Sequence, residues 1–316
     1  ESHPGLSAAG AAFDHELAVF RQQVQKFVVG LGVTQQGPIG FVHEGQAYRS
    51  FEVNKVDGFM ERIIHNETLR KERPQTWMAM VLSGLLKSIE GDAISYDFVE
   101  SGGKKIPELV KRIALADAGL VLIAGHVSTY GAVLKGQKAR CTVCTHANTL
   151  DIDLATLKMP EVTDEVIETV RVQLQTGWQR VVDPSKAGQK ELGWEDEVFD
   201  VFEFGIPTVG DALRNEKHYV ASRVLDFQLK IVNDRLKSVK ASKDGFVMPQ
   251  DMFEAYKSAS AFFADRNGLF GNDRTLIRDA MNKLPQVNMT VTVICDSCMA
   301  DFEAGVSYGS FFPLVS

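Results

Sequence analysis

Cysteine is the residue type whose placement in this chain most directly suggests chemistry. The sequence contains four cysteines, and they form two C-x-x-C pairs, Cys141 with Cys144 and Cys295 with Cys298. Two intervening residues let a tight turn direct both sulfurs at one ion, so that each pair supplies half of a tetrahedral sulfur site. We therefore expect all four cysteines to bind a single structural zinc ion.

The separation of the two pairs is unusual for such a site. Zinc ribbons commonly place their pairs about 15 to 20 residues apart, whereas residues 145–294, a stretch of 150, intervene here. One shared ion remains the economical interpretation, because two isolated pairs would each leave a metal half-coordinated. A shared site would tie the two halves of the chain together.

Other uses of these cysteines stay open. Each pair is also compatible with a redox disulfide, although neither pair starts a helix after a strand, where the helix dipole would lower a thiol pKa. Four thiolates can hold an iron–sulfur cluster, but the usual three closely spaced cysteines are missing. His146, two residues after Cys144, is a further candidate ligand that could replace one thiolate.

Strand-like sequence surrounds each cysteine pair. Alternating apolar and polar residues precede and follow both pairs, which is the pattern of a half-buried strand. The segment before Cys141 is VLKGQKAR and the segment before Cys295 is VNMTVTVI. We predict a strand–CxxC–strand knuckle at each place, and the two knuckles together would form a zinc-ribbon-like unit.

Helical patterns dominate the rest of the chain. These helical patterns are interrupted by a hairpin with its turn near 43–46, by short strands at 93–99 and 195–203, and by a capping pair of Thr208 and Asp211. Asp117 is the expected cap of one helix and Gly131 its expected stop. Apolar spacing predicts helices over Phe13–Val29, Val56–Glu72, Thr76–Ile89, Pro107–Ala114, Asp117–Ser128, Thr163–Gln175, Ala212–Lys240, Pro249–Asp265 and Asp273–Lys283.

These patterns predict an α+β fold that is mostly helical. We divide the chain into an N-terminal helix and hairpin region at 1–74, a helical segment with the first knuckle at 75–160, and a helical C-terminal half with the second knuckle at 161–316. Helices followed by a strand–CxxC–strand unit occur twice, which is a weak internal repeat in the order of the predicted elements.

Composition narrows the class of protein. The chain has 316 residues, 45% hydrophobic and 24% charged, which is ordinary for a soluble globular protein. A net charge of −7 argues against broad nucleic-acid binding, which needs a basic face. We find no apolar run long enough for a membrane span and no secretory signal pattern, so we expect a soluble, intracellular-type chain.

Motifs for enzymatic catalysis are missing from the sequence. There is no phosphate-binding glycine loop, no H-E-x-x-H and no G-x-S-x-G elbow. We expect His126, on an apolar helical stretch, to be a hydrogen-bonded core or interface histidine, and the carboxylates at 195–200 to form a solvated face. We therefore predict a protein that is not an enzyme, and the alternative is a metal- or thiol-dependent redox enzyme.

Several short motifs resemble a known family. The stretch from 106 to 154 and the C-terminal TVICDSCMADFEAGVSYGSFFP are similar to the baseplate hub and tail-assembly (chaperone) proteins of T-even-like contractile-tailed phages. The resemblance covers roughly residues 75–160 and 198–316, and the first 70 residues show none. The matching motifs are Ala116-Asp117, Tyr130-Gly131, Arg140-Cys141, Cys144, Asp151-Ile152-Asp153-Leu154 and the 203–211 step into a helix.

The resemblance implies a structural or assembly role and carries over no catalytic residue. It implies partners among other baseplate or tail proteins, with no nucleic acid and no membrane span. The expected location is the virion tail, or the cytoplasm of the infected host during assembly. Phe311-Phe312-Pro313 would either dock to such a partner or pack onto the chain's own core.

Overall fold

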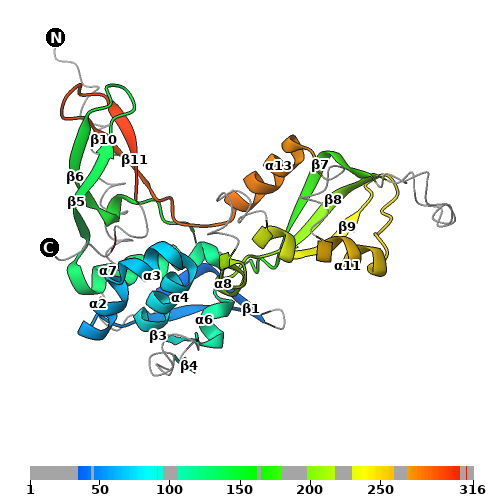
Figure 1. The fold of residues 1–316 in the computed structure, drawn as a ribbon, viewed down its shortest axis with the longest axis horizontal. Coiled ribbons are helices and arrows are strands. Elements are labelled where there is room, and N and C mark those ends of the chain that lie inside the picture. The colour runs from blue at the N-terminus through cyan, green and yellow to red at the C-terminus, as the bar shows by residue number, and fades with distance from the viewer. Residues whose placement is uncertain are drawn as a thin grey trace, which may run out of the picture.

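The computed structural model describes residues 35–43, 46–90, 92–94, 106–161, 165–179, 198–217, 230–259, 269–306 and 311. Most of their buried apolar side chains fall into two clusters. One cluster joins segments from both ends of the sequence, from Phe51 to Phe311. The other contains only residues between Val172 and Ile277. Figure 1 shows the corresponding parts as separate bodies.

The first unit is a sheet covered by helices. Its strands pair in the order β1-β2-β3-β4, and the helix α4 lies at the centre of its core, with Val81, Leu82 and Leu85 fully buried. Its elements are β1 (Gln35–His43), β2 (Gln46–Val53), α2 (Gly58–Ile64), α3 (Glu67–Glu72), α4 (Pro74–Leu85), β3 (Leu86–Ile89), β4 (Asp92–Ala93), α6 (Glu108–Arg112), the 3-10 turn η1 (Leu115–Asp117) and α7 (Ala118–Tyr130).

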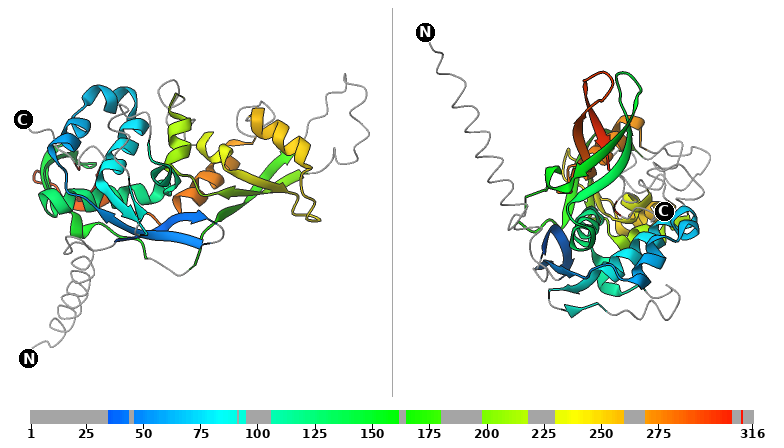
Figure 2. Two further views of the ribbon diagram at one scale, coloured as in Figure 1. Left: turned by 90° about the horizontal axis from the view of Figure 1, so that it is seen from below. Right: turned by 90° about the vertical axis from the view of Figure 1, so that its left-hand side faces the viewer.

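Two hairpins leave this unit together and form what we call the cysteine arm. The first consists of β5 (Val133–Arg140) and β6 (Ala147–Asp153), and the second of β10 (Thr290–Ile294) and β11 (Asp301–Gly305). The hairpins lie side by side in Figure 1 and in the right-hand view of Figure 2. Each hairpin carries a cysteine pair in the turn at its far end.

The second unit occupies the sequence between these hairpins. Its sheet has the order β7-β8-β9, with β7 at Thr169–Gln179, β8 at Val198–Gly205 and β9 at Leu236–Lys240. The helices α11 (Gln250–Ala259) and α13 (Gly271–Asn282) complete it. The long spacing between the cysteine pairs therefore holds a folded body with its own core.

A short helix from this stretch holds the two units together. In α8 (Val209–Arg214), Val209 donates its backbone N–H to the carbonyl of Ile113 in the first unit at 3.0 Å. The Asp211 carboxylate, which is fully buried, pairs with Arg214 and also with Arg235 at the entrance to β9. Thr208 and Asp211 form the predicted capping box, so this prediction is confirmed.

The first strand of each unit contains a bulge with a glycine. The register of β1 is irregular between Gln36 and Phe41, and that of β7 between Gln173 and Trp178. Each irregularity contains a glycine at positive φ, Gly40 at 72° and Gly177 at 73°. A left-handed residue bends the strand there and turns its N–H groups out of the ladder.

A buried aspartate from a later helix accepts those N–H groups in each unit. Asp117, just before α7, accepts the N–H groups of Ile39 and Gly40. Asp273, in the first turn of α13, accepts those of Gln175, Thr176 and Gly177 at 2.8–3.3 Å. In both units the helix then leads into a cysteine hairpin. The internal repeat therefore includes both the order of elements and the contact between the buried aspartate and the bulge.

The fold is mixed α+β, as predicted, but a mostly helical chain is not confirmed, because strands are as prominent as helices among the described residues. The helix predicted over Thr163–Gln175 is wrong: Thr169–Gln179 is the strand β7. Val170, Val172 and Leu174 alternate with polar residues, and β8 offers an apolar partner for that face.

Two further stretches are helical only in part. The helix expected over Thr76–Ile89 stops at Leu85, after which Leu86–Ile89 pairs with β2. One or two helices were expected over Ala212–Lys240; the described residues are helical up to Arg214, at 216–217 and at 230–234, and Leu236–Lys240 pairs with β8. Sheet pairing overrides helical spacing at the end of both stretches. The helix predicted at Phe13–Val29 and most of the strand at 93–99 lie outside the described residues.

The domain boundaries predicted at 74/75 and 160/161 stay predictions. The first buried cluster crosses both of them, since it includes Met60, Trp77 and Phe302. The chain leaves the first unit after β6 and re-enters it before β10, which makes the second unit an insertion between two segments of the first.

Replacement of Asp273 by alanine tests how the second unit is held. The variant leaves three backbone N–H groups without their acceptor, so we expect the free energy of unfolding to fall by about 3 kcal/mol. Urea unfolding measures the change. Asp279→Ala, an exposed position on the same helix, is the control and should stay within about 0.5 kcal/mol of the parent. Equal stability of both variants would contradict the role of Asp273.

Candidate metal centre

The first cysteine pair sits in a turn closed by backbone hydrogen bonds. Cys141 donates its N–H to the carbonyl of His146 at 2.9 Å, and Thr145 donates to the carbonyl of Cys141 at 3.0 Å. Thr145 has a positive φ of 62°, which reverses the chain directly after the second cysteine. The N–H of Val143 points at the Sγ of Cys141 from 3.4 Å.

The second pair repeats this geometry at every corresponding atom. Cys295 donates its N–H to the carbonyl of Ala300 at 3.0 Å, and Met299 donates to the carbonyl of Cys295 at 3.0 Å. Met299 has a φ of 57°, and the N–H of Ser297 lies 3.4 Å from the Sγ of Cys295. The two turns are therefore equivalent halves of one arrangement.

The sulfur atoms of the two turns converge. The Sγ atoms of Cys141 and Cys298 are 3.8 Å apart, those of Cys144 and Cys295 are 3.6 Å apart, and all four lie within 4.8 Å of one another. Four sulfurs at about 2.3 Å from a zinc ion form a tetrahedron with edges of about 3.8 Å. The spacing thus fits a tetrahedral metal site and exceeds the ~2.05 Å of a disulfide, and all four cysteines are free.

Burial differs among the four ligand candidates. Cys141 and Cys295, the first residue of each pair, are buried at 2% and 0% exposure, whereas Cys144 is half-buried and Cys298 is exposed. One side of the sulfur cluster is therefore sealed by the arm, and solvent reaches the other. His146, the alternative to one of the thiolates, has an exposed side chain and is not part of the cluster, so the expectation of four cysteine ligands fits better.

The thiols perturb one another strongly. The N–H groups of Cys298 and Ser297 lower the pKa of the Cys295 thiol to about 6. The N–H of Ala300 acts in the same direction on Cys298, but hydrogen bonds with the other three thiols and burial raise the pKa of Cys298 to about 12. Four thiolates at these distances repel one another, and a bound cation would displace the protons and remove that repulsion.

Asn148 joins the two turns and was not predicted as a functional residue. It is 1% exposed. Its Oδ1 accepts the N–H of Asp296 in the second turn at 2.9 Å, and its Nδ2 donates to the carbonyl of His146 in its own turn at 3.1 Å. One side chain thus fixes the distance between the hairpins. No sequence pattern marks an asparagine for this role, because its partner is 148 positions away.

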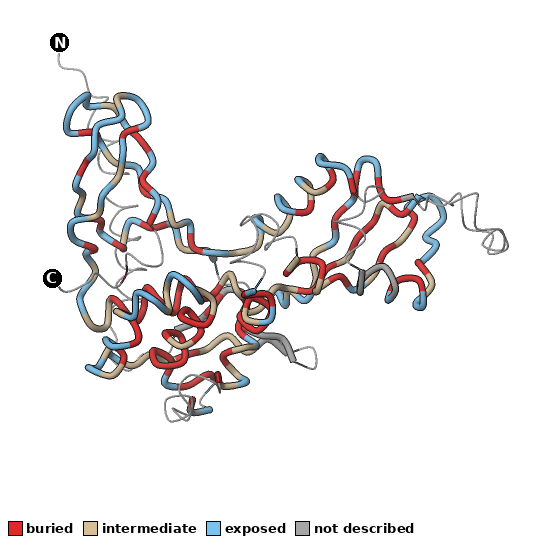
Figure 3. Tube along the Cα trace, viewed as in Figure 1, coloured by how far each residue is buried: buried red, intermediate tan, exposed pale blue. Residues whose placement is uncertain are grey.

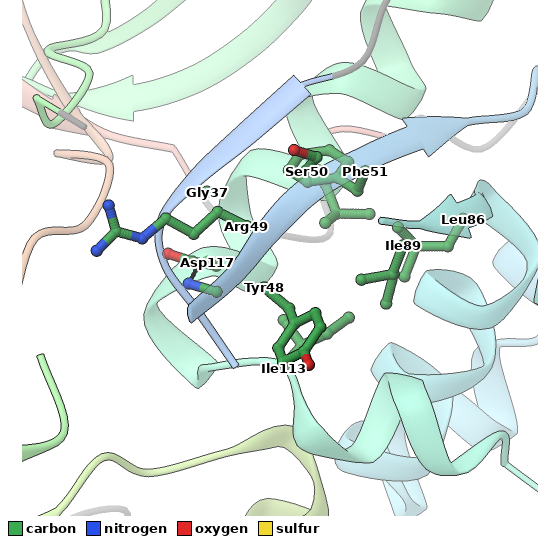
Figure 4. Close-up of a pocket in the computed structure, with 11 residues that line it drawn as sticks. Gly37, Tyr48, Arg49, Ser50, Phe51, Leu86, Ile89, Ile113 and Asp117 are labelled. Carbon is green, nitrogen blue, oxygen red and sulfur yellow. Dashed lines mark hydrogen bonds between the residues drawn. The ribbon is translucent and has the colours of Figure 1, made fainter. Parts of the chain in front are cut away.

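A small cavity in the first unit lies beside Asp117 and is lined mostly by apolar side chains, among them Phe51, Leu86 and Ile89 (Figure 4). We predicted that Asp117 caps its helix. It stands at the N-cap position of α7 without a capping hydrogen bond, and its carboxylate instead accepts an N–H group in the bulge of β1. Its Oδ1 is buried without a hydrogen-bond partner among the described residues. Burial raises the pKa of Asp117 to about 7, although the N–H groups of Gly40 and Ile39 and the charge of Arg49 oppose the shift.

The remaining candidates are structural or lie outside the described residues. His126 is 2% exposed and its Nδ1 contacts the carbonyl of Phe311, so it is the predicted hydrogen-bonded core histidine. Phe311 itself is fully buried in the first core, which leaves it no surface for a partner, and Phe312 and Pro313 are outside the described residues. So are Glu195 and its acidic neighbours up to 197.

Comparison with known proteins adds no relative. No protein-family model, curated protein or solved structure matches this chain. None of the described helices is long and apolar enough to cross a membrane.

Removal of the Asn148 side chain should loosen the centre without touching a ligand. Asn148→Ala leaves the Asp296 N–H and the His146 carbonyl without the side chain that connects them, so we expect metal affinity to fall roughly 10-fold or more. Competition with a chromophoric chelator measures the affinity. Thr149→Ala, at the exposed neighbouring position of β6, should keep the parental affinity. Equal affinities would show that Asn148 does not position the turns.

The buried carboxyl of Asp117 should make stability depend on pH. Between its ordinary pKa of 3.8 and about 7 the folded chain keeps a proton that the unfolded chain has lost, so stability from this group declines as pH rises through that window. Asp117→Asn abolishes the titration, so the stability of the variant relative to the parent should increase as pH rises from 5.5 to 8. Thermal unfolding of both proteins at each pH measures this difference, in which the contributions of the cysteines cancel. A pH-independent difference would contradict a raised pKa.

Proposed function

We propose that this chain is a non-enzymatic structural or assembly protein whose cysteine arm is held by one zinc ion, bound by Cys141, Cys144, Cys295 and Cys298. The convergence of four free sulfurs within 4.8 Å, from two hairpins far apart in the sequence, carries the proposal. The equivalent turns make the arm a zinc-ribbon-like unit, in which the metal joins the hairpins at their tips.

A structural role for the ion follows from the number of ligands. Catalytic zinc keeps one coordination position open for water or substrate, whereas four thiolates fill a tetrahedral site. The energy of such binding then stabilises the fold, since the unfolded chain has no site. In this chain it would hold the segment that re-enters the first unit after residue 282 against the segment that leaves it before residue 161.

A place in a contractile phage tail is the biological setting that we propose. The short motifs shared with baseplate hub and tail-assembly proteins support it, and no other observation does. In that setting the protein would act through contacts with other baseplate or tail proteins, either in the virion or in the infected host's cytoplasm during assembly.

Thiol chemistry is the second candidate function, and one observation favours it. The pKa of the Cys295 thiol is lowered to about 6, and a thiolate can attack a disulfide or an oxidant. Cys295 itself is buried, and the neighbouring thiol that solvent reaches, Cys298, has a pKa raised to about 12. In such an enzyme the sulfurs would cycle between thiols and disulfides.

Metal and thiol analysis of the purified chain separates the two functions. A structural site predicts about one zinc per chain, and four thiols that react with a disulfide reagent only after denaturation or zinc removal. Bound iron in place of zinc, or a disulfide that thioredoxin reduces, would favour the redox enzyme. A chain that contains no metal and four reactive thiols would overturn the zinc site.

Replacement of the exposed ligand tests what the metal does. Cys298→Ser should lower zinc affinity by more than the 10–100-fold loss typical for a residue that merely supports a ligand, and should lower the thermal unfolding midpoint in parallel. Ser297→Ala keeps the backbone N–H and should behave as the parent. Full stability and zinc content in Cys298→Ser would refute the tethering role.

The phage setting has its own test. We expect mass spectrometry to find this chain in purified tails or in tail-assembly intermediates of the phage that encodes it. Absence from both would remove the setting and leave the metal site untouched.

A further inference from the structure

The two hairpins of the cysteine arm pack together through one face each. Leu134 and Ile152 from the first hairpin lie in the same buried cluster as Phe302 and Ala304 from the second. Side chains alternate along a strand, so the residues between them point outward. Figure 3 shows this change between buried and exposed positions along the arm. The arm therefore has two outer faces, one on each hairpin.

The outer face of the first hairpin is basic toward its tip. Lys135, Lys138 and Arg140 on β5 are all exposed. Their cross-strand neighbours near the tip carry no charge: Lys138 faces Thr149 and Arg140 faces Ala147. The acidic residues of β6 lie nearer the base, where Asp151 accepts the N–H of Gly136.

The outer face of the second hairpin is acidic. Asp301 and Glu303 on β11 are exposed, and so is Asp296 in the turn. Their cross-strand neighbours are Ile294, opposite Asp301, and Thr292, opposite Glu303. Ile294 is 56% exposed, so an apolar side chain lies among these carboxylates.

None of these exposed charged side chains forms an ion pair within the described part of the chain. The ion pairs found there involve other residues. Val143 and Met299, at the tips of the turns, are also 67% and 73% exposed. The two faces of one rigid arm thus offer opposite charges with apolar side chains next to them.

We propose that the cysteine arm is a self-association surface, in which the basic face of one copy binds the acidic face of the next. Opposite faces of the same element cannot satisfy each other within one copy, whereas a second copy supplies each with its complement. Such a contact is head-to-tail and builds a ring or an open row. The surface rests on the proposed function in one respect, because the metal fixes the hairpins that carry both faces.

The size of the hairpins limits the strength of this contact. A face of two short strands buries less than the ~1,200 Å² of a stable interface, so we expect a dissociation constant in the micromolar range or weaker. Exposed ion pairs are screened within about 10 Å at 0.1 M salt. The association should therefore weaken at least 10-fold between ~50 and ~500 mM salt.

Sedimentation velocity of the zinc-loaded full chain tests the proposal. The parent should form dimers and larger species up to about 100 µM at low salt. Lys138→Glu with Arg140→Glu has two acidic faces, and Asp301→Lys with Glu303→Lys has two basic faces. Each variant alone should remain monomeric, and an equimolar mixture should associate again. Lys243→Glu with Lys283→Glu, at exposed positions outside the arm, changes the net charge as much as the first variant does and should associate as the parent does.

The outcomes separate the surface from the metal site. A parent that stays monomeric at low salt, or a mixture that does not associate although both variants keep their zinc, would overturn the surface. Association of a parent that contains no zinc would overturn the metal site and leave the surface supported. If a charge reversal costs zinc, Lys138→Ala with Arg140→Ala replaces it, and unchanged association of that variant would overturn the surface.

Discussion

The convergence of four sulfur atoms from two hairpins is the constraint on which the architecture depends. A loop of 150 residues costs only about 2 kcal/mol more to close than the 15–20-residue loop of an ordinary zinc ribbon, because closure entropy grows with the logarithm of length. Structural zinc contributes about 10–16 kcal/mol in isolated fingers. The long separation is therefore no obstacle to a shared site, and a folded unit can occupy the space between the pairs.

The second unit explains why the loop can be so long. It has its own buried cluster, and α8 and the Asp211 ion pairs attach it to the first unit. Much of the loop is thus ordered without the metal. The same order of sheet, bulge, buried aspartate, helix and cysteine hairpin occurs in both parts, which gives the candidate metal site two equivalent halves from one chain.

Equivalent backbones do not make the halves chemically equal. Asn148 in the first hairpin bridges to the second, where the buried Phe302 stands at the corresponding position, seven residues after the first cysteine. Likewise Asp273 uses both oxygens on its bulge, whereas Asp117 leaves Oδ1 buried without a partner among the described residues. The two arm faces also differ in charge. These differences give the arm a direction, which a symmetric ribbon would lack.

The sequence alone determined the local features. The spacing of Cys141 with Cys144 and of Cys295 with Cys298 predicts the paired sulfurs, and Thr208 with Asp211 predicts a capping box, because such contacts depend on backbone geometry over a few residues. The same spacing also predicts that the two pairs share one site, and the four sulfurs do converge. Only the tertiary structure decided that Asn148 joins the turns and that Thr169–Gln179 is a strand. Those outcomes depend on which distant surfaces are buried together, and no local pattern encodes that choice.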